Sequence, residues 1–167
     1  MAFRTDAGGI AFACRDVKLQ SNASTWATKL SQLSRQTGVV RIMTYSLPTM
    51  AYVCTQPGRR SQDICVIAHA KFLARAQEIT HLFPAIRVAV HDAVHSKVLL
   101  IAPQTVIISS ANFGTSHWHE TSVSFHAKDA HDWYVDKVFD PLWDAYKEVE
   151  IFPRHSRVIY VVLYILL

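Results

Sequence analysis

Four polar side chains that lie close together in the sequence could form a phosphate-transfer site. His95 and Lys97 are two residues apart, and Ser110 and Asn112, also two residues apart, follow shortly after them. An imidazole can attack phosphorus to give a phosphohistidine, and an ammonium and an amide can supply the charge and the hydrogen bonds that a phosphoryl transition state needs. Side chains of these types could therefore act together on a phosphate group, with His95 as the candidate nucleophile.

A β-hairpin would bring these four side chains together. Two apolar stretches, residues 94–102 and 105–112, flank a Pro-Gln pair, and proline is favoured at the first central position of a turn. If Ala102 pairs with Thr105, all four polar side chains lie on one face, because side chains alternate along a strand. The expected cross-strand pairs are Lys97 with Ser110 and His95 with Asn112. The rest of that face would be apolar and comprise Leu99, Ile101, Val106 and Ile108.

This spacing resembles the signature of the phospholipase D superfamily, which is H-x-K-x4-D, then G-S-x-N, then a downstream Glu. The matching residues are His95, Lys97, Ser110, Asn112 and Glu120. Residues 41–46 resemble the family's second strand, and the likeness is strongest to its small bacterial endonucleases. Two positions differ, since Ala102 replaces the family Asp and Ser109 replaces the family Gly. The family Asp is implied to be a supporting group, so activity is still expected.

The resemblance implies a metal-independent phosphodiesterase that acts on nucleic acid, most simply DNA, and uses no cofactor. Lys97 and Asn112 would bind the phosphate oxygens, and Ser110 would add a hydrogen bond. Glu120 would orient the His95 imidazole through its other ring nitrogen. One copy of the motif is half a site in this family, and 167 residues have room for one copy. The resemblance therefore implies a symmetric homodimer.

The distribution of charge also favours a polyanionic partner. Residues 1–127 carry 12 basic and 6 acidic side chains. Residues 128–150 carry 3 basic and 7 acidic side chains, and residues 151–167 carry 2 basic and no acidic side chains. The first segment is the one expected to meet nucleic acid.

Three further residues are candidates for contacts with nucleic acid. Arg59 and Arg60 follow a Pro-Gly pair and could bind phosphates, although a solvated turn is the simpler alternative. Trp118 follows the hairpin and could stack on a base, although packing is the alternative.

Two other functions remain open from the sequence. A lipid phosphodiesterase or phosphatidyltransferase would use the same histidine chemistry and would require an apolar substrate channel. A nucleic-acid-binding module that has lost catalysis is suggested by Ala102. No metal site is expected, because the sequence has neither a C-x-x-C pair nor an H-E-x-x-H helix.

Strand and helix patterns alternate along the sequence and would position the site. They predict one α/β domain over residues 1–150, with a mixed sheet flanked by helices on both faces. The expected strands are residues 9–14, 39–45, 63–70, 85–90, 94–102, 105–112 and 121–125. The expected helices are residues 24–36, 71–83 and 128–149, the last kinked or split by Pro141.

Residues 151–167 form an apolar tail of unknown role. Its longest apolar run has ten residues, about half the length that a membrane-spanning helix needs. The N-terminus does not resemble a signal peptide. The three cysteines are widely spaced and predict buried thiols in a cytoplasmic protein. They are Cys14, Cys54 and Cys65.

Overall fold

The computed structural model describes residues 9–22, 38–55, 64–114 and 116–145 of the 167-residue chain. These residues form a seven-stranded mixed sheet with the strand order β1-β7-β6-β5-β2-β3-β4. β2, β3 and β4 are parallel, and the remaining neighbours pair antiparallel. The strands are β1 (Val17–Asn22), β2 (Val40–Thr44), β3 (Ile64–His69), β4 (Ile86–His91), β5 (Val98–Ile101), β6 (Thr105–Ser109) and β7 (Glu120–His126).

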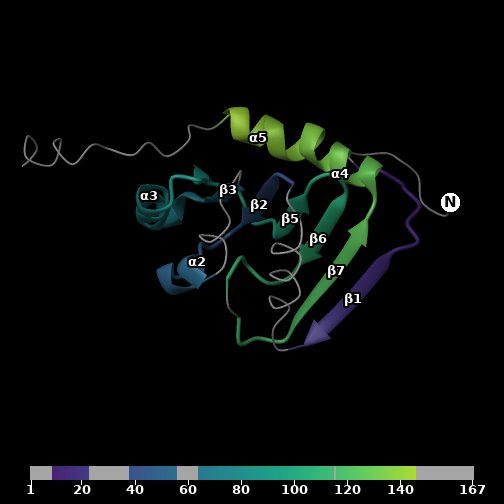
Figure 1. Ribbon diagram of the computed structural model, residues 1–167, viewed down its shortest axis with the longest axis horizontal. Coiled ribbons are helices and arrows are strands. Elements are labelled where there is room, and N and C mark those ends of the chain that lie inside the picture. The colour runs from purple at the N-terminus through teal and green to yellow at the C-terminus, as the bar shows by residue number, and fades with distance from the viewer. Residues whose placement is uncertain (1–8, 23–37, 56–63, 115, 146–167) are drawn as a thin grey trace, which may run out of the picture.

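Helices cover both faces of this sheet, as predicted (Figure 1). On one face lie α2 (Met50–Thr55), the short 3-10 helix η2 (Ala70–Phe72) and α3 (Leu73–Leu82). On the other lies a continuous helical stretch of α4 (Lys128–Tyr134), the π-helical segment η3 (Val135–Phe139) and α5 (Asp140–Ala145). A core cluster fills each interface, and most of its strand residues are Val, Ile and Leu. Burial on both faces explains why the central strands are continuously apolar rather than alternating.

Most expected elements are confirmed, but the first strand is misplaced in the prediction. The strand over residues 9–14 is wrong, because the ladder with β7 begins at Val17. The earlier segment is irregular and packs side chains on the core, where the Phe12 ring stacks on Phe125 at 5.1 Å. Its apolar residues therefore serve packing rather than strand pairing. The helix expected over residues 24–36 lies outside the described residues.

The predicted hairpin forms, but with a register shifted by one residue. Ile101, not Ala102, pairs with Thr105, so the turn holds three residues instead of two. Lys97 consequently faces Ser109, whose backbone N–H donates to the Lys97 carbonyl at 3.0 Å. Because a one-residue slip exchanges the two faces, the expected pairs of Lys97 with Ser110 and His95 with Asn112 are wrong. Val106 and Ile108 likewise lie on the face opposite to Leu99 and Ile101.

The α-helical pattern of the last helix is interrupted just before Pro141, where the kink or split is expected. The turn before the proline, η3, adopts a π-helical hydrogen-bond pattern and separates α4 from α5. A proline lacks the N–H that the preceding turn would accept, and a local π segment is one way to accommodate that loss. Val135 and Phe139 of this segment are buried in the core cluster between the helix and the sheet.

The cysteines are only partly as expected. Cys65 is buried and Cys14 is half-buried, but Cys54 is exposed on α2. The prediction of a buried thiol at Cys54 is wrong, because α2 lies at the surface and turns this residue outward. Over the described ranges, no helix combines the length and the apolar character needed to cross a bilayer.

Candidate active site

The candidate site lies along one edge of the sheet. β2, β3 and β4 end there, β5 begins there, and the chain leaves β6 and enters β7 there. In open sheets of this kind, ligands bind outside the carboxyl ends of the parallel strands. The polar residues that follow or precede these strand ends therefore converge on a common location.

His95 and Lys97 are in direct contact in the segment that leads into β5. The Lys97 Nζ lies 3.2 Å from His95 Nδ1 and 3.4 Å from Nε2, and it donates to the His95 carbonyl oxygen at 2.7 Å. The intervening Ser96 is hydrogen-bonded with Tyr134 of α4, which ties this segment to the helical layer. The ring nitrogens and the ammonium are thus held together where they could act on one phosphate.

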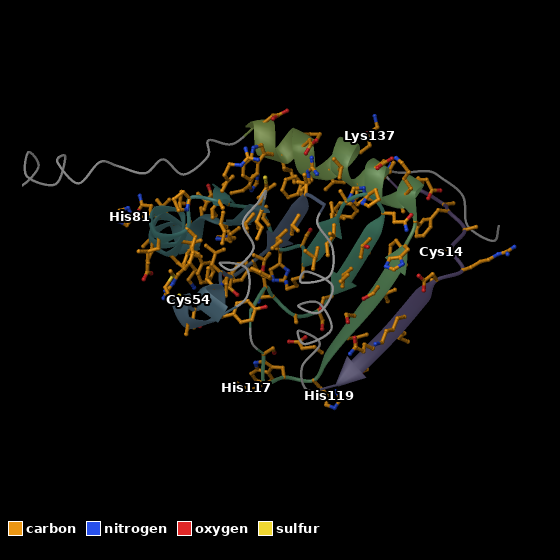
Figure 2. The ribbon with its side chains drawn as sticks, viewed as in Figure 1. Cys14, Cys54, His81, His117, His119 and Lys137 are labelled. Carbon is orange, nitrogen blue, oxygen red and sulfur yellow. The ribbon has the colours of Figure 1, made fainter. Side chains whose placement is uncertain are left out.

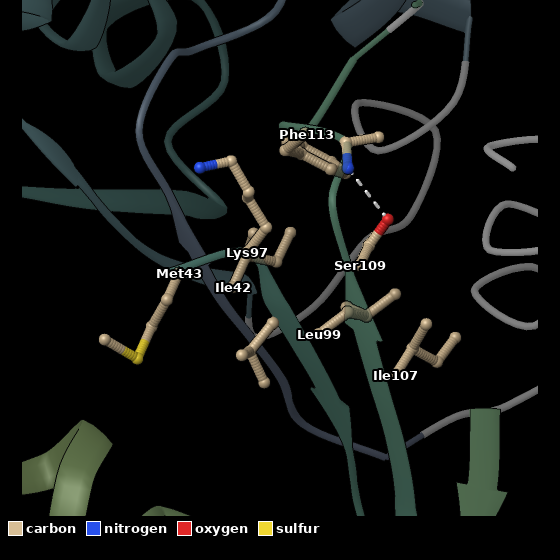
Figure 3. Close-up of a pocket in the computed structure, with 9 residues that line it drawn as sticks. Ile42, Met43, Lys97, Leu99, Ile107, Ser109 and Phe113 are labelled. Atoms are coloured by element: carbon tan, nitrogen blue, oxygen red, sulfur yellow. Dashed lines mark hydrogen bonds between the residues drawn. The ribbon is translucent and has the colours of Figure 1, made fainter. Parts of the chain in front are cut away.

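The Lys97 side chain is half-buried at the rim of a small pocket (Figure 3). Its lining also includes Ser109, whose hydroxyl accepts from the Ala111 N–H at 3.0 Å. Burial lowers the pKa of Lys97, and the charge of Glu120 acts against that shift. The ammonium therefore loses its proton at a lower pH than an ordinary lysine would. The influence of Glu120 on this pKa also places its carboxylate within electrostatic range of Lys97.

Asn112 is fixed by the end of β2. Its Oδ1 accepts from the N–H groups of Tyr45 at 3.2 Å and Ser46 at 3.4 Å. The fully buried Thr44 hydroxyl donates to the Ser46 carbonyl and accepts from the Phe113 N–H at 2.8 Å. Since the backbone occupies the amide oxygen, the Asn112 Nδ2 hydrogens are left as donors for a ligand.

Glu120 is held by two serine hydroxyls at the start of β7. Ser110 donates to its Oε2 in a very short hydrogen bond, and Ser116 donates to its Oε1 at 2.8 Å. The Ser110 hydroxyl also accepts from the Thr121 N–H at 3.0 Å. The carboxylate is therefore oriented by its own loop.

These contacts differ from two roles that the sequence suggested. The hydrogen bonds of Glu120 in the described structure run to Ser110 and Ser116, and the ring nitrogens of His95 lie against Lys97. The Ser110 hydroxyl donates to Glu120 in this structure, and a hydrogen bond from Ser110 to a phosphate stays a prediction.

Trp118 lies in the loop before β7 and is 79% exposed. Its backbone N–H donates to the Ser116 hydroxyl at 3.2 Å, which links this loop to the Glu120 carboxylate. His117 and His119 flank it and lie at the surface, away from the helices (Figure 2). Most of the surface of Trp118 is therefore open to solvent. Arg59 and Arg60 lie outside the described residues.

Sequence reasoning missed Tyr45 and His69 as neighbours of His95. The Tyr45 ring lies 5.2 Å from the His95 ring and 4.9 Å from the His69 ring, centroid to centroid. Both residues stand at the carboxyl ends of parallel strands, and that position was the signal that could have identified them. In the described parts of the chain, no cluster of three His, Cys, Asp or Glu side chains suitable for a metal ion is found.

Ala102 lies in the hairpin turn, at the opposite end of β5 from the site. Its N–H donates to the Val39 carbonyl at 3.0 Å, and a Cβ on Gly38 would come within 2.1 Å of the Ala102 carbonyl oxygen. Five residues along a strand separate it from Lys97 by about 16 Å. A side chain at this position therefore lies beside the hairpin turn and the start of β2, and does not contact the reacting groups.

We therefore expect Ala102→Asp to change the rate of DNA cleavage by less than about tenfold, roughly 1.4 kcal/mol in barrier. Initial rates of the wild type and the variant on plasmid DNA at equal protein concentration test this. A gain of several orders of magnitude would show that the natural chain is a degenerate binder rather than an enzyme.

Several solved structures share this fold, although no protein-family model and no curated protein matches the sequence. Nuc from Salmonella typhimurium, a phospholipase D family member, superposes with a TM-score of 0.63 at 16% identity, over 80% of this chain and 98% of that one. NucT from Helicobacter pylori superposes with a TM-score of 0.57 at 13% identity, over 78% of this chain and 98% of that one. TrmBL2 is an archaeal chromatin protein with a novel mode of DNA binding. It superposes with a TM-score of 0.61 at 10% identity, over 81% of this chain and 54% of that one. The chain thus has a phospholipase D-like α/β fold.

Proposed function

We propose that this chain is a phosphodiesterase of the phospholipase D type that cleaves nucleic acid, with DNA as the expected polymer. The contact of the Lys97 ammonium with both ring nitrogens of His95 carries this proposal. The amide of Asn112, whose oxygen accepts from the backbone at the end of β2, supports it at the same sheet edge. So does the fold shared with Nuc, a phospholipase D family member.

The reaction would proceed through a phosphohistidine on His95. A ring nitrogen forms a bond to phosphorus while the bond from phosphorus to the leaving oxygen breaks, and that oxygen takes up a proton. Lys97 and the Nδ2 hydrogens of Asn112 would meet the negative charge on the phosphate oxygens. Water then attacks the phosphohistidine and gives a proton to the group that protonated the leaving oxygen. The bond from nitrogen to phosphorus breaks, which releases the phosphate end and restores the imidazole.

The proton for the leaving oxygen requires a second group. The His95 ring that attacks phosphorus cannot also donate a proton on the opposite side in the same step. We propose a symmetric homodimer in which the second copy of His95 is the donor, so that each active site is composite. Glu120 would contribute a fixed negative charge near Lys97 in each half.

Nucleic acid would extend beyond the reacting phosphate. Trp118 is proposed to stack on a base, since 79% of its side chain is exposed next to the Glu120 loop. Arg59 and Arg60 are proposed phosphate contacts on sequence grounds. A reducing compartment such as the cytoplasm is the expected location, because Cys54 is a free and exposed thiol.

The proposed chemistry requires no divalent ion, so plasmid cleavage should continue in millimolar EDTA. Purified wild-type protein and a matched His95→Ala preparation would be compared, which separates this activity from a contaminating nuclease. Complete loss of cleavage in EDTA, with recovery on adding magnesium, would contradict the assignment.

A second candidate is a nucleic-acid-binding module without catalysis. It is favoured by the likeness of the fold to TrmBL2, a DNA-binding chromatin protein, and by Ala102 in place of the family Asp. The same plasmid assay distinguishes the two candidates, because a binding module would retard the DNA without cutting it.

A further inference from the structure

His69 ends β3 at the same sheet edge as His95, beyond Tyr45. The backbone N–H of His69 donates to the Tyr45 carbonyl at 3.2 Å, which ties the ends of β3 and β2 together. The Tyr45 ring contacts both imidazoles, so the His69 and His95 rings are at most about 10 Å apart. Two imidazoles this close could contact phosphates of the same nucleic-acid strand.

The hydrogen bonding of His69 fixes which ring nitrogen can act. Its Nδ1 accepts from the Lys71 N–H at 3.0 Å at the start of η2. A neutral imidazole has one N–H, so its hydrogen is then on Nε2. The adjacent His91, its partner in the parallel ladder, has the same arrangement with the Ala93 N–H at 2.7 Å. His69 is thus half-buried, and its Nε2–H is held in a fixed orientation as a hydrogen-bond donor.

Lys71 is two residues from His69, and Asp92 follows its ladder partner His91. Lys71 on η2 and Asp92 after β4 are both exposed and opposite in sign. An imidazole whose Nδ1 accepts a backbone hydrogen bond adds no charge of its own. A ligand here would therefore be held by hydrogen bonding, with the Tyr45 ring fixing the plane of the imidazole.

We propose that His69 is a second phosphate-binding residue, whose Nε2–H donates to a phosphodiester next to the scissile one in the same nucleic-acid strand. This inference rests on the proposed function, since it takes the reacting phosphate to lie at His95. The bound strand would then run along the sheet edge from the Glu120 loop, past His95 and Tyr45, toward the ends of β3 and β4.

Two substitutions of His69 separate this role from a structural one. Asparagine is a good helix cap and can accept from the Lys71 N–H, but it is too short to replace Nε2. Glutamine can place an amide N–H near the position of Nε2, but it is a poorer cap. The proposal therefore expects His69→Asn to weaken ligand binding and His69→Gln to preserve most of it. A purely structural His69 would give the reverse order.

The measurement compares a short single-stranded oligonucleotide with bis(p-nitrophenyl) phosphate, a diester that has a single phosphate. For His69→Asn, kcat/KM for the oligonucleotide should fall at least about tenfold more than kcat/KM for the single diester. His81→Asn, a change at an exposed position on α3, is the matched control and should alter neither value. Equal losses on both substrates, or no loss on either, would overturn the proposal.

Binding of the same oligonucleotide, followed by fluorescence anisotropy, keeps the subsite testable if the chain does not cleave. His69→Asn should raise Kd about tenfold without changing the slope of log Kd against log salt, because no charge is removed. Wild type that binds without cutting, and loses affinity in His69→Asn, would reject the nuclease but retain the subsite. Wild type that binds no oligonucleotide, or a slope that changes with the variant, would reject the subsite.

Discussion

His95→Ala should reduce cleavage of DNA at least about a thousandfold, roughly 4 kcal/mol in barrier, while leaving affinity for DNA close to that of the wild type. The substitution removes the nitrogen that would form the bond to phosphorus. Lys97 and Asn112 remain to bind phosphate, because their anchors are the His95 carbonyl and the end of β2. Cleavage and binding should therefore separate in this variant.

The measurement pairs a plasmid cleavage assay with binding at several salt concentrations. The slope of log affinity against log salt should be the same in wild type and variant, at about −0.9 for each phosphate neutralised on duplex DNA. His81→Ala, at an exposed position on α3 (Figure 2), is the control for loss of an imidazole elsewhere. If His95→Ala lost binding and cleavage together, His95 would be a structural residue and the proposed mechanism would be wrong.

Element types were predictable from the sequence because their signals are local. The parallel strands β3 and β4 are apolar runs bounded by polar residues, and α3 lies between them at helical length. The hairpin was predictable for the same reason, but its register was not. One additional residue in the turn moves Ser109, rather than Ser110, opposite Lys97, and turn length is not determined by a Pro-Gln pair alone.

The sequence named candidate site residues but did not determine their contacts. The motif named His95 and Lys97, and the structure brings these two into contact. Tyr45 and His69 became neighbours of His95 only because β2 lies between β5 and β3, a strand order that local patterns do not specify. The partners of Glu120 depend on loop conformation, since Ser116 reaches its carboxylate from within the loop before β7.

A mixture of one part wild type and nine parts His95→Ala should retain about 1% of the activity of pure wild type at the same total protein concentration. Random pairing leaves about one dimer in a hundred with the His95 imidazole in both subunits. Independent subunits would retain about 10%. The tenfold difference follows from the chemistry, since one imidazole attacks phosphorus while another protonates the leaving oxygen.

Subunit exchange must be complete, which differently tagged wild-type and variant chains would verify by co-purification. Mixing wild type with His81→Ala, which retains the nucleophile, should leave activity unchanged at every ratio and controls for dilution. Across the series, activity should follow the square of the wild-type fraction. A linear dependence, or a monomer at the assay concentration, would reject the composite site. Each subunit would then need its own proton donor, and His91, which ends β4 at the same sheet edge, would be the next residue to replace.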